Sequence, residues 1–196
     1  MEKTKCVIFD ADGMVIDSEV FSVQLEKDYG IPNDIMLPFF KGPFQECIVG
    51  KADLKKEIAP FIKKGGWEGS ADGLLDYWFK VQHKIDNRII KEIKRLREKG
   101  VRCYLASNQE KYRAEYIRKN MRLENIFDDI FLSSDIGYKK PQKEFYEKVF
   151  QKIVADISVE NSKLCYGMIR KKTREKRASL GLKRILTKIL KILKKK

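Results

Sequence analysis

Four short apolar runs, spaced along the chain, limit the folds that it can adopt. Each has the length of a buried β-strand. The runs are residues 6–9, 101–106, 130–132 and 164–166. Longer segments near the last three runs carry apolar residues at helical spacing; they are residues 88–99, 110–120 and 142–155. This alternation predicts an α/β fold, a doubly wound parallel sheet with helices on both faces.

The alternation is interrupted after the first run. Three amphipathic segments, separated by Pro and Gly, lie there at residues 20–29, 55–63 and 74–84. We expect a small inserted α-helical domain at residues 16–84, and a core domain made of residues 1–15 and 85–196. Such an insert would lie over the carboxyl ends of the strands, where open α/β sheets bind ligands.

Two carboxylates follow the first apolar run directly. Asp10 and Asp12 are two positions apart, and Gly13 permits a tight turn after them. One carboxylate can attack phosphorus, while the second protonates the leaving oxygen and then activates water. A turn rich in Asp is the alternative interpretation of these residues. The longer motif, which continues to Asp17-Ser-Glu, is more specific than the first four residues alone.

This stretch resembles the first motif of the haloacid dehalogenase (HAD) superfamily, in its phosphatase and phosphoglucomutase-like branch with a helical cap. The resemblance implies a HAD-like Rossmannoid core, with Asp10 as nucleophile and Asp12 as general acid and base. It also implies Mg²⁺ as cofactor, held by the Asp10 carboxylate and the Asp12 backbone carbonyl. Gly13 would lie among the substrate-binding residues, and residues 16–84 would be the cap.

Two later segments resemble the second and third HAD motifs. Ser107 ends a predicted strand and would donate a hydrogen bond to a phosphoryl oxygen, with the Asn108 backbone N–H nearby. Lys140 directly precedes Pro141 and would offset the charge on nucleophile and phosphate; by the same position it is favoured over Lys139. Taken singly, such a serine is more often a turn former and such a lysine a solvated surface residue.

The fourth HAD motif, which supplies aspartates to the Mg²⁺ shell, is missing as the sequence is written. Met168 and Ile169 follow the last predicted strand, and neither side chain can coordinate a hard cation. A one-nucleotide shift of reading frame after Tyr166 can convert residues 167–173 into W-D-D-K-K-E-N. We therefore predict a Mg²⁺-dependent phosphohydrolase for a small phosphomonoester, acting through an aspartyl-phosphate and impaired in this form. Mutase activity is not distinguished from hydrolysis.

The basic charge of the chain is concentrated at its end. Residues 167–196 carry thirteen Lys or Arg against one acid, whereas the other 166 residues have 29 basic and 27 acidic groups. A shifted frame explains this break, since codons for acids become codons for Met, Ile and Lys. The alternative is an inactive HAD-like protein whose cationic C-terminal helix binds an anionic membrane or nucleic acid.

The partner that we expect is a small phosphorylated metabolite, without nucleic acid or membrane. No run of about 18 apolar residues suggests a transmembrane helix, and the first residues lack the apolar core of a signal peptide. The four cysteines have no metal-binding spacing and are expected to be reduced thiols. These features predict a cytoplasmic protein.

Overall fold

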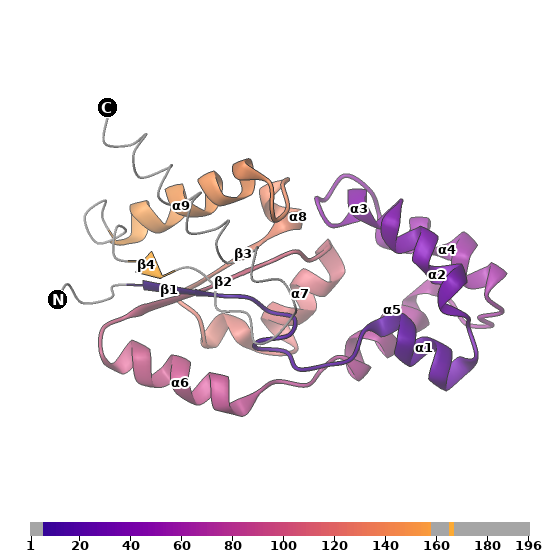
Figure 1. Ribbon diagram of the computed structural model, residues 1–196, viewed down its shortest axis with the longest axis horizontal. Coiled ribbons are helices and arrows are strands. Elements are labelled where there is room, and N and C mark those ends of the chain that lie inside the picture. Colours follow the sequence, from indigo (N-terminus) through magenta and orange to yellow (C-terminus); the bar gives the residue numbers. More distant parts are fainter. Residues whose placement is uncertain (1–5, 158–164, 167–196) are drawn as a thin grey trace.

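A parallel β-sheet forms the centre of the protein (Figure 1). The computed structural model describes residues 6–157 and the backbone of residues 165–166. The sheet has the strand order β3-β2-β1-β4. Its strands are β1 (Cys6–Phe9), β2 (Arg102–Ser107), β3 (Asp129–Leu132) and β4 (Cys165–Tyr166). All neighbouring strands run parallel, which confirms the predicted fold class.

Helices cover both faces of this sheet. Cys103 and Leu105 of β2 pack with α6 (Asn87–Glu98) and α7 (Lys111–Lys119), whereas Tyr104 and Ala106 pack with α9 (Lys143–Ile157). Successive strand residues point to opposite faces, so one strand contributes to two separate hydrophobic cores. In Figure 1, α9 lies on one side of the strands and α6 on the other. The short elements η1 (Leu123–Asn125) and α8 (Ser133–Ile136) flank β3.

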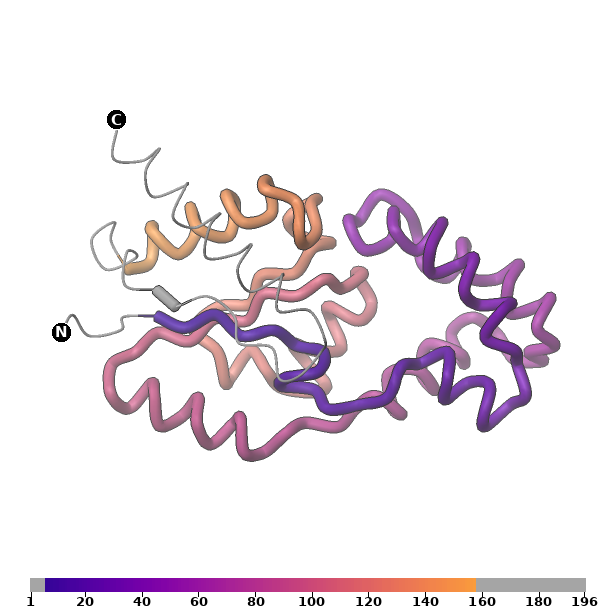
Figure 2. Tube along the Cα trace, viewed as in Figure 1, coloured from indigo at the N-terminus to yellow at the C-terminus, as the bar shows by residue number. Residues whose placement is uncertain are grey.

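A separate group of five helices, here called the helical group, lies beyond one end of the sheet (Figure 2). It consists of α1 (Phe21–Tyr29), α2 (Asn33–Lys41), α3 (Phe44–Cys47), α4 (Leu54–Lys64) and α5 (Ala71–Val81). These helices enclose a hydrophobic cluster of their own, in which the rings of Phe21 and Trp78 stack with centroids 4.2 Å apart. The group therefore has a core independent of the sheet.

Helix α2 was not predicted from the sequence. It contains Pro38, and a proline inside a helix removes a backbone donor and usually breaks the pattern that identifies a helix. Helix α5 begins at Ala71, inside a stretch whose glycines are typical of a loop. The Ser70 hydroxyl caps its first turn by accepting a hydrogen bond from the Gly73 N–H, and so permits a helix there. In both helices, burial of apolar side chains outweighs the local preference of proline or glycine for a loop.

The chain crosses between sheet and helical group twice, and the two crossings pair with each other. Ile16 and Ile85 form an antiparallel bridge, the Asp17 N–H donates to the Lys84 carbonyl at 2.8 Å, and the Asp86 N–H donates to the Val15 carbonyl at 2.9 Å. We call this pairing the hinge. The limits predicted for the two domains, residues 16–84 and the rest, stay a prediction.

Two sequence expectations meet different outcomes here. Within the described residues, no helix is long and apolar enough to cross a membrane; the cytoplasmic location stays a prediction. The expectation of reduced thiols is wrong for Cys6, which is disulfide-bonded, while Cys47 and Cys103 are buried free thiols. Spacing along the sequence does not reveal which residues a sheet brings together.

The residues of the fourth motif and of the basic tail lie outside the described part.

Candidate active site

The carboxyl edge of the sheet carries side chains from three of the sequence motifs. Asp10 directly follows β1, and Ser107 is the last residue of β2. Because these strands are parallel, with Phe9 opposite Leu105, their ends lie at the same edge. Lys140 reaches this edge from the loop between α8 and α9. Residues far apart in sequence therefore meet at one place.

The buried Asp10 and the partly buried Lys140 form an ion pair. Lys140 Nζ lies 2.7 Å from Asp10 Oδ1, and it also donates a 3.0 Å hydrogen bond to the Ala106 carbonyl. The side chain of Lys140 is 12% exposed and that of Asp10 is 4% exposed. The same Asp10 oxygen accepts a hydrogen bond from the Ala11 N–H. Water screens such a pair only weakly, so the lysine can offset negative charge on Asp10 and on an oxyanion beside it.

Asn108 fixes the backbone of Lys140. Its Nδ2 donates to the Lys140 carbonyl at 3.0 Å, and its Oδ1 accepts from the Lys140 N–H at 2.7 Å. The peptide bond to Pro141 is cis. The neighbouring Lys139 points elsewhere, with its Nζ 2.6 Å from Gln45 Oε1 in the helical group. Of the two adjacent lysines, Lys140 is the one that reaches Asp10.

The Asp12 carboxylate lies in the loop beyond β1 and accepts a hydrogen bond from Gln109, with 2.7 Å between Oδ2 and Nε2. The residue as a whole is exposed, although Gln109, on one side of its carboxyl group, is buried. Desolvation is the largest influence on its pKa and raises it; the charge of Asp10 adds to the rise, while Arg113, Gln109 and Lys140 oppose it. A raised pKa favours the protonated form, which can serve as a general acid.

Gly13 gives the loop between these motifs its shape. Its φ is +74°, in the left-handed region that side chains disfavour, and its N–H donates to the Ile16 carbonyl at 2.9 Å. Apart from its chain neighbours, no atom of the described residues lies within 4 Å of the position that a Cβ would take, so the requirement for glycine is one of backbone conformation. Its role in substrate binding stays a prediction.

Sequence reasoning missed two buried polar residues beside this site, Gln109 and Arg113. Gln109 Nε2 contacts Ser107 Oγ at 3.1 Å in addition to Asp12. Arg113, on α7, acts electrostatically on Asp12 and donates to two backbone carbonyls at the end of α5. Their one sequence signal was their position just after the second motif.

The described residues supply only part of a Mg²⁺ shell. The donors that the resemblance assigns are the Asp10 carboxylate and the Asp12 backbone carbonyl, both hard oxygens that suit this ion. Among residues 6–157, no three His, Cys, Asp or Glu side chains gather in a way that could hold a metal. The donors present therefore fit Mg²⁺ in kind, but they supply only part of its shell.

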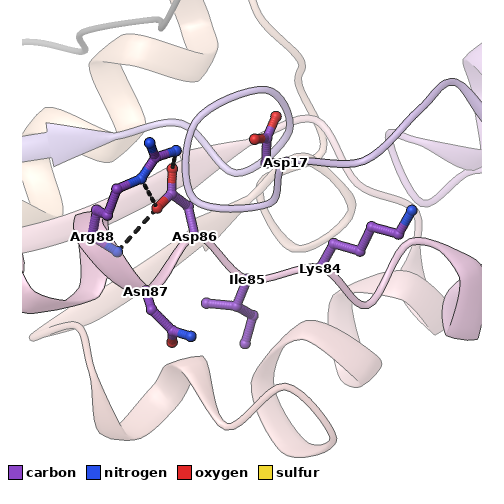
Figure 3. Close-up of a pocket in the computed structure, with 6 residues that line it drawn as sticks. All are labelled: Asp17, Lys84, Ile85, Asp86, Asn87 and Arg88. Atoms are coloured by element: carbon purple, nitrogen blue, oxygen red, sulfur yellow. Dashed lines mark hydrogen bonds and ion pairs between the residues drawn. The ribbon is translucent and has the colours of Figure 1, made fainter.

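A pocket of about 350 Å³ lies at the hinge (Figure 3). It is lined by Asp17 and residues 84–88. Asp86 and Arg88 neutralise each other there, with 2.7 Å between Oδ2 and Nη2, and Figure 3 shows both hydrogen-bonded side chains. None of the motif residues Asp10, Ser107 and Lys140 lines it, so we assign it no catalytic role.

Comparison with known families decides the classification. The family described as haloacid dehalogenase-like hydrolase matches residues 4–161. The chain belongs to this family. The HAD-like hydrolases were also the family indicated by the three sequence motifs, so that prediction is confirmed; the predicted branch and cap type stay predictions.

Solved structures share the fold of this HAD-like hydrolase. A HAD family enzyme from Bacteroides thetaiotaomicron has a TM-score of 0.67 and 18% identity, and the match covers 91% of this chain and 98% of that one. A predicted HAD-like family hydrolase from Porphyromonas gingivalis gives 0.63 and 18%, with 93% and 97% covered. L-2-haloacid dehalogenase from Xanthobacter autotrophicus gives 0.56 and 16%, with 88% and 80% covered. No curated protein matches the chain significantly.

Proposed function

We propose that this HAD-like hydrolase is a phosphohydrolase that cleaves a small phosphomonoester through an aspartyl-phosphate. The observation that carries the proposal is the ion pair of the buried Asp10 with the partly buried Lys140. A second carboxylate and a strand-end hydroxyl lie beside it. A carboxylate nucleophile next to a fixed cation suits attack on phosphorus, where negative charge must be neutralised. The B. thetaiotaomicron enzyme also has a structure in complex with magnesium and inorganic phosphate, which is consistent with this proposal.

In the first step, a carboxylate oxygen of Asp10 forms a bond to phosphorus while the bond from phosphorus to the alcohol oxygen breaks. Asp12 donates its proton to that leaving oxygen. Lys140 and the Ser107 hydroxyl bind the phosphoryl oxygens, which lowers the energy of the charge that develops on them. The step leaves an aspartyl-phosphate, an ionised Asp12 and a free alcohol.

In the second step, water attacks the phosphorus of the aspartyl-phosphate. Asp12 accepts the proton of that water, the bond between phosphorus and the Asp10 oxygen breaks, and inorganic phosphate leaves. Both residues then regain their starting protonation states. Bound Mg²⁺, held by the Asp10 carboxylate and the Asp12 carbonyl, would supply positive charge that neutralises the phosphoryl group.

The position of the helical group favours a small substrate over a large one. We propose that residues 16–84 form a cap over the site, because several of their contacts reach core loops beside it. Gln45 meets Lys139, next to Lys140, and Asp53 accepts a 2.6 Å hydrogen bond from the Tyr112 hydroxyl on α7. A covered site excludes water and large substrates. Release of inorganic phosphate distinguishes hydrolysis from a mutase reaction.

Turnover of a panel of phosphomonoesters with Mg²⁺ tests the proposal. The wild-type protein is compared with Asp10→Asn, and with Asp76→Asn as a control that alters an exposed carboxylate paired with Lys80 on α5. Removing a nucleophile should reduce turnover by about a thousandfold or more, whereas the control should match the wild type. Equal turnover by Asp10→Asn and the wild type would rule out Asp10 as nucleophile.

A further inference from the structure

Gln109 is a buried polar side chain, 5% exposed, placed between two of the motif residues. Its backbone is held by Ser133: the Gln109 N–H donates to Ser133 Oγ at 2.9 Å, and the same hydroxyl donates to the Gln109 carbonyl at 3.2 Å. The Ser134 N–H also donates to that carbonyl at 3.2 Å. Ser133 and Ser134 therefore fix the backbone from which the Gln109 side chain extends.

The amide of Gln109 joins the two motif residues in front of it. Its Nε2 lies 2.7 Å from Asp12 Oδ2 and 3.1 Å from Ser107 Oγ. An amide nitrogen has two N–H groups, so one can serve each contact. This orientation of the amide, with its nitrogen toward Asp12 Oδ2, suits the ionised Asp12 that the first step leaves, because the opposite orientation would set Oε1 against a carboxylate oxygen.

We propose that Gln109 is the positioning residue of this active site, which holds the Asp12 carboxylate and the Ser107 hydroxyl in their working orientations. The inference rests on the proposed function for the roles of those two residues. Because an N–H of Gln109 binds Oδ2 of Asp12, the other carboxyl oxygen, Oδ1, carries and transfers the proton. With the other N–H on Ser107 Oγ, the hydroxyl hydrogen is left to point at a phosphoryl oxygen.

The leaving group of the substrate distinguishes this role from a structural one. A nitrophenolate leaves readily without a proton, whereas an alkoxide depends on a general acid. In Gln109→Leu, kcat/KM, which reports formation of the aspartyl-phosphate, should therefore fall about tenfold or more further for an alkyl phosphate than for p-nitrophenyl phosphate, because any loss at Ser107 affects both substrates alike. Gln24→Leu is the matched control, since Gln24 donates to Asp28 at 2.8 Å on the exposed surface of the helical group. An equal loss with both substrates would overturn the proposal.

A second measurement needs no turnover and keeps Gln109 in place. The side-chain amide signals of Gln109, observed by ¹⁵N–¹H NMR, should shift in Asp12→Ala and in Ser107→Ala, while the signals of Gln24 stay unchanged. Signals of Gln109 that move in neither variant would overturn the proposed contacts. A wild-type protein without phosphatase activity would count against the proposed function, and the amide signals would still decide the position of Gln109.

Discussion

At the scale of single residues, the catalytic candidates that the sequence indicates are those at the ends of apolar runs. A carboxylate or hydroxyl directly after a buried strand is conspicuous, so the amino-acid sequence alone singles out Asp10 and Ser107. Lys140 needed a second clue, its place before Pro141. Gln109 gave no such clue, because a glutamine at the start of a helix is ordinarily a surface residue. Its importance depends on contacts across 97 positions to Asp12, which no local pattern encodes.

Glu110 shows another residue whose burial could not be predicted. It is 3% exposed, and its carboxylate caps α7 by accepting hydrogen bonds from the N–H groups of Tyr112 and Arg113. Desolvation nevertheless raises its pKa to about 7, against the effect of those bonds and of the Arg113 charge. The folded protein thus keeps a proton that the unfolded chain releases at lower pH.

This difference predicts how stability depends on pH. Between the ordinary glutamate pKa and about 7 the native state binds more protons than the unfolded state, so the free energy of unfolding should fall as pH rises, by about 3 kcal/mol at most. Glu110→Gln should remove this decline. Urea denaturation at several values from about pH 5 to about pH 8 measures it. Glu115→Gln, at an exposed position of α7, is the control; an unchanged decline in Glu110→Gln would contradict the assignment.

At the scale of elements, the strands and the helices around the sheet could be predicted closely, and the helical group less so. The periodicity of α6, from Asn87 to Glu98, marks an amphipathic helix that faces one core. The helical group is packed from many short helices, and its contacts with the sheet domain depend on single atoms. At Gly50, a Cβ would lie 2.6 Å from the carbonyl oxygen of Ser134 in the core. The backbones of the two parts therefore approach closely there.

The close approach at Gly50 can be separated from the cost of its backbone conformation. Gly50 and Gly66 both have positive φ, +76° and +84°. In the part of the chain that the structure describes, however, no atom other than those of its chain neighbours lies within 4 Å of a Cβ at Gly66. Alanine at either position should cost about 1–2 kcal/mol of strain. Gly50→Ala should also displace the helical group from Ser134 and lower the midpoint of urea denaturation further. Equal midpoints for the two variants would show that the approach at Gly50 does not matter.

At the scale of the whole molecule, the sequence could not supply the order β3-β2-β1-β4, because strand neighbours are chosen by packing of the complete sheet. It did reveal a break in composition. Residues 1–166 are nearly neutral, whereas residues 167–196 carry almost the entire excess of positive charge. The position that the resemblance assigns to the fourth HAD motif falls on this break, beyond the described residues. We therefore expect the capacity of the site for Mg²⁺ to depend on a segment whose composition differs from that of the rest.

The shifted-frame hypothesis makes a quantitative prediction for the metal. Replacing Met168 and Ile169 together by Asp should raise the affinity for Mg²⁺ by about tenfold or more, since even partners that do not touch a metal change its affinity by roughly 10- to 100-fold. Calorimetric titration with Mg²⁺, with and without inorganic phosphate, measures the change, and Met168→Leu with Ile169→Val is the matched control.

Sequencing the gene across the Tyr166 codon tests the frame itself, because an extra nucleotide there would restore the aspartates. If the frame stands as written and the Asp variant binds Mg²⁺ no better, the cationic helix becomes the leading alternative. Its binding to anionic vesicles or DNA should then fall steeply with added salt.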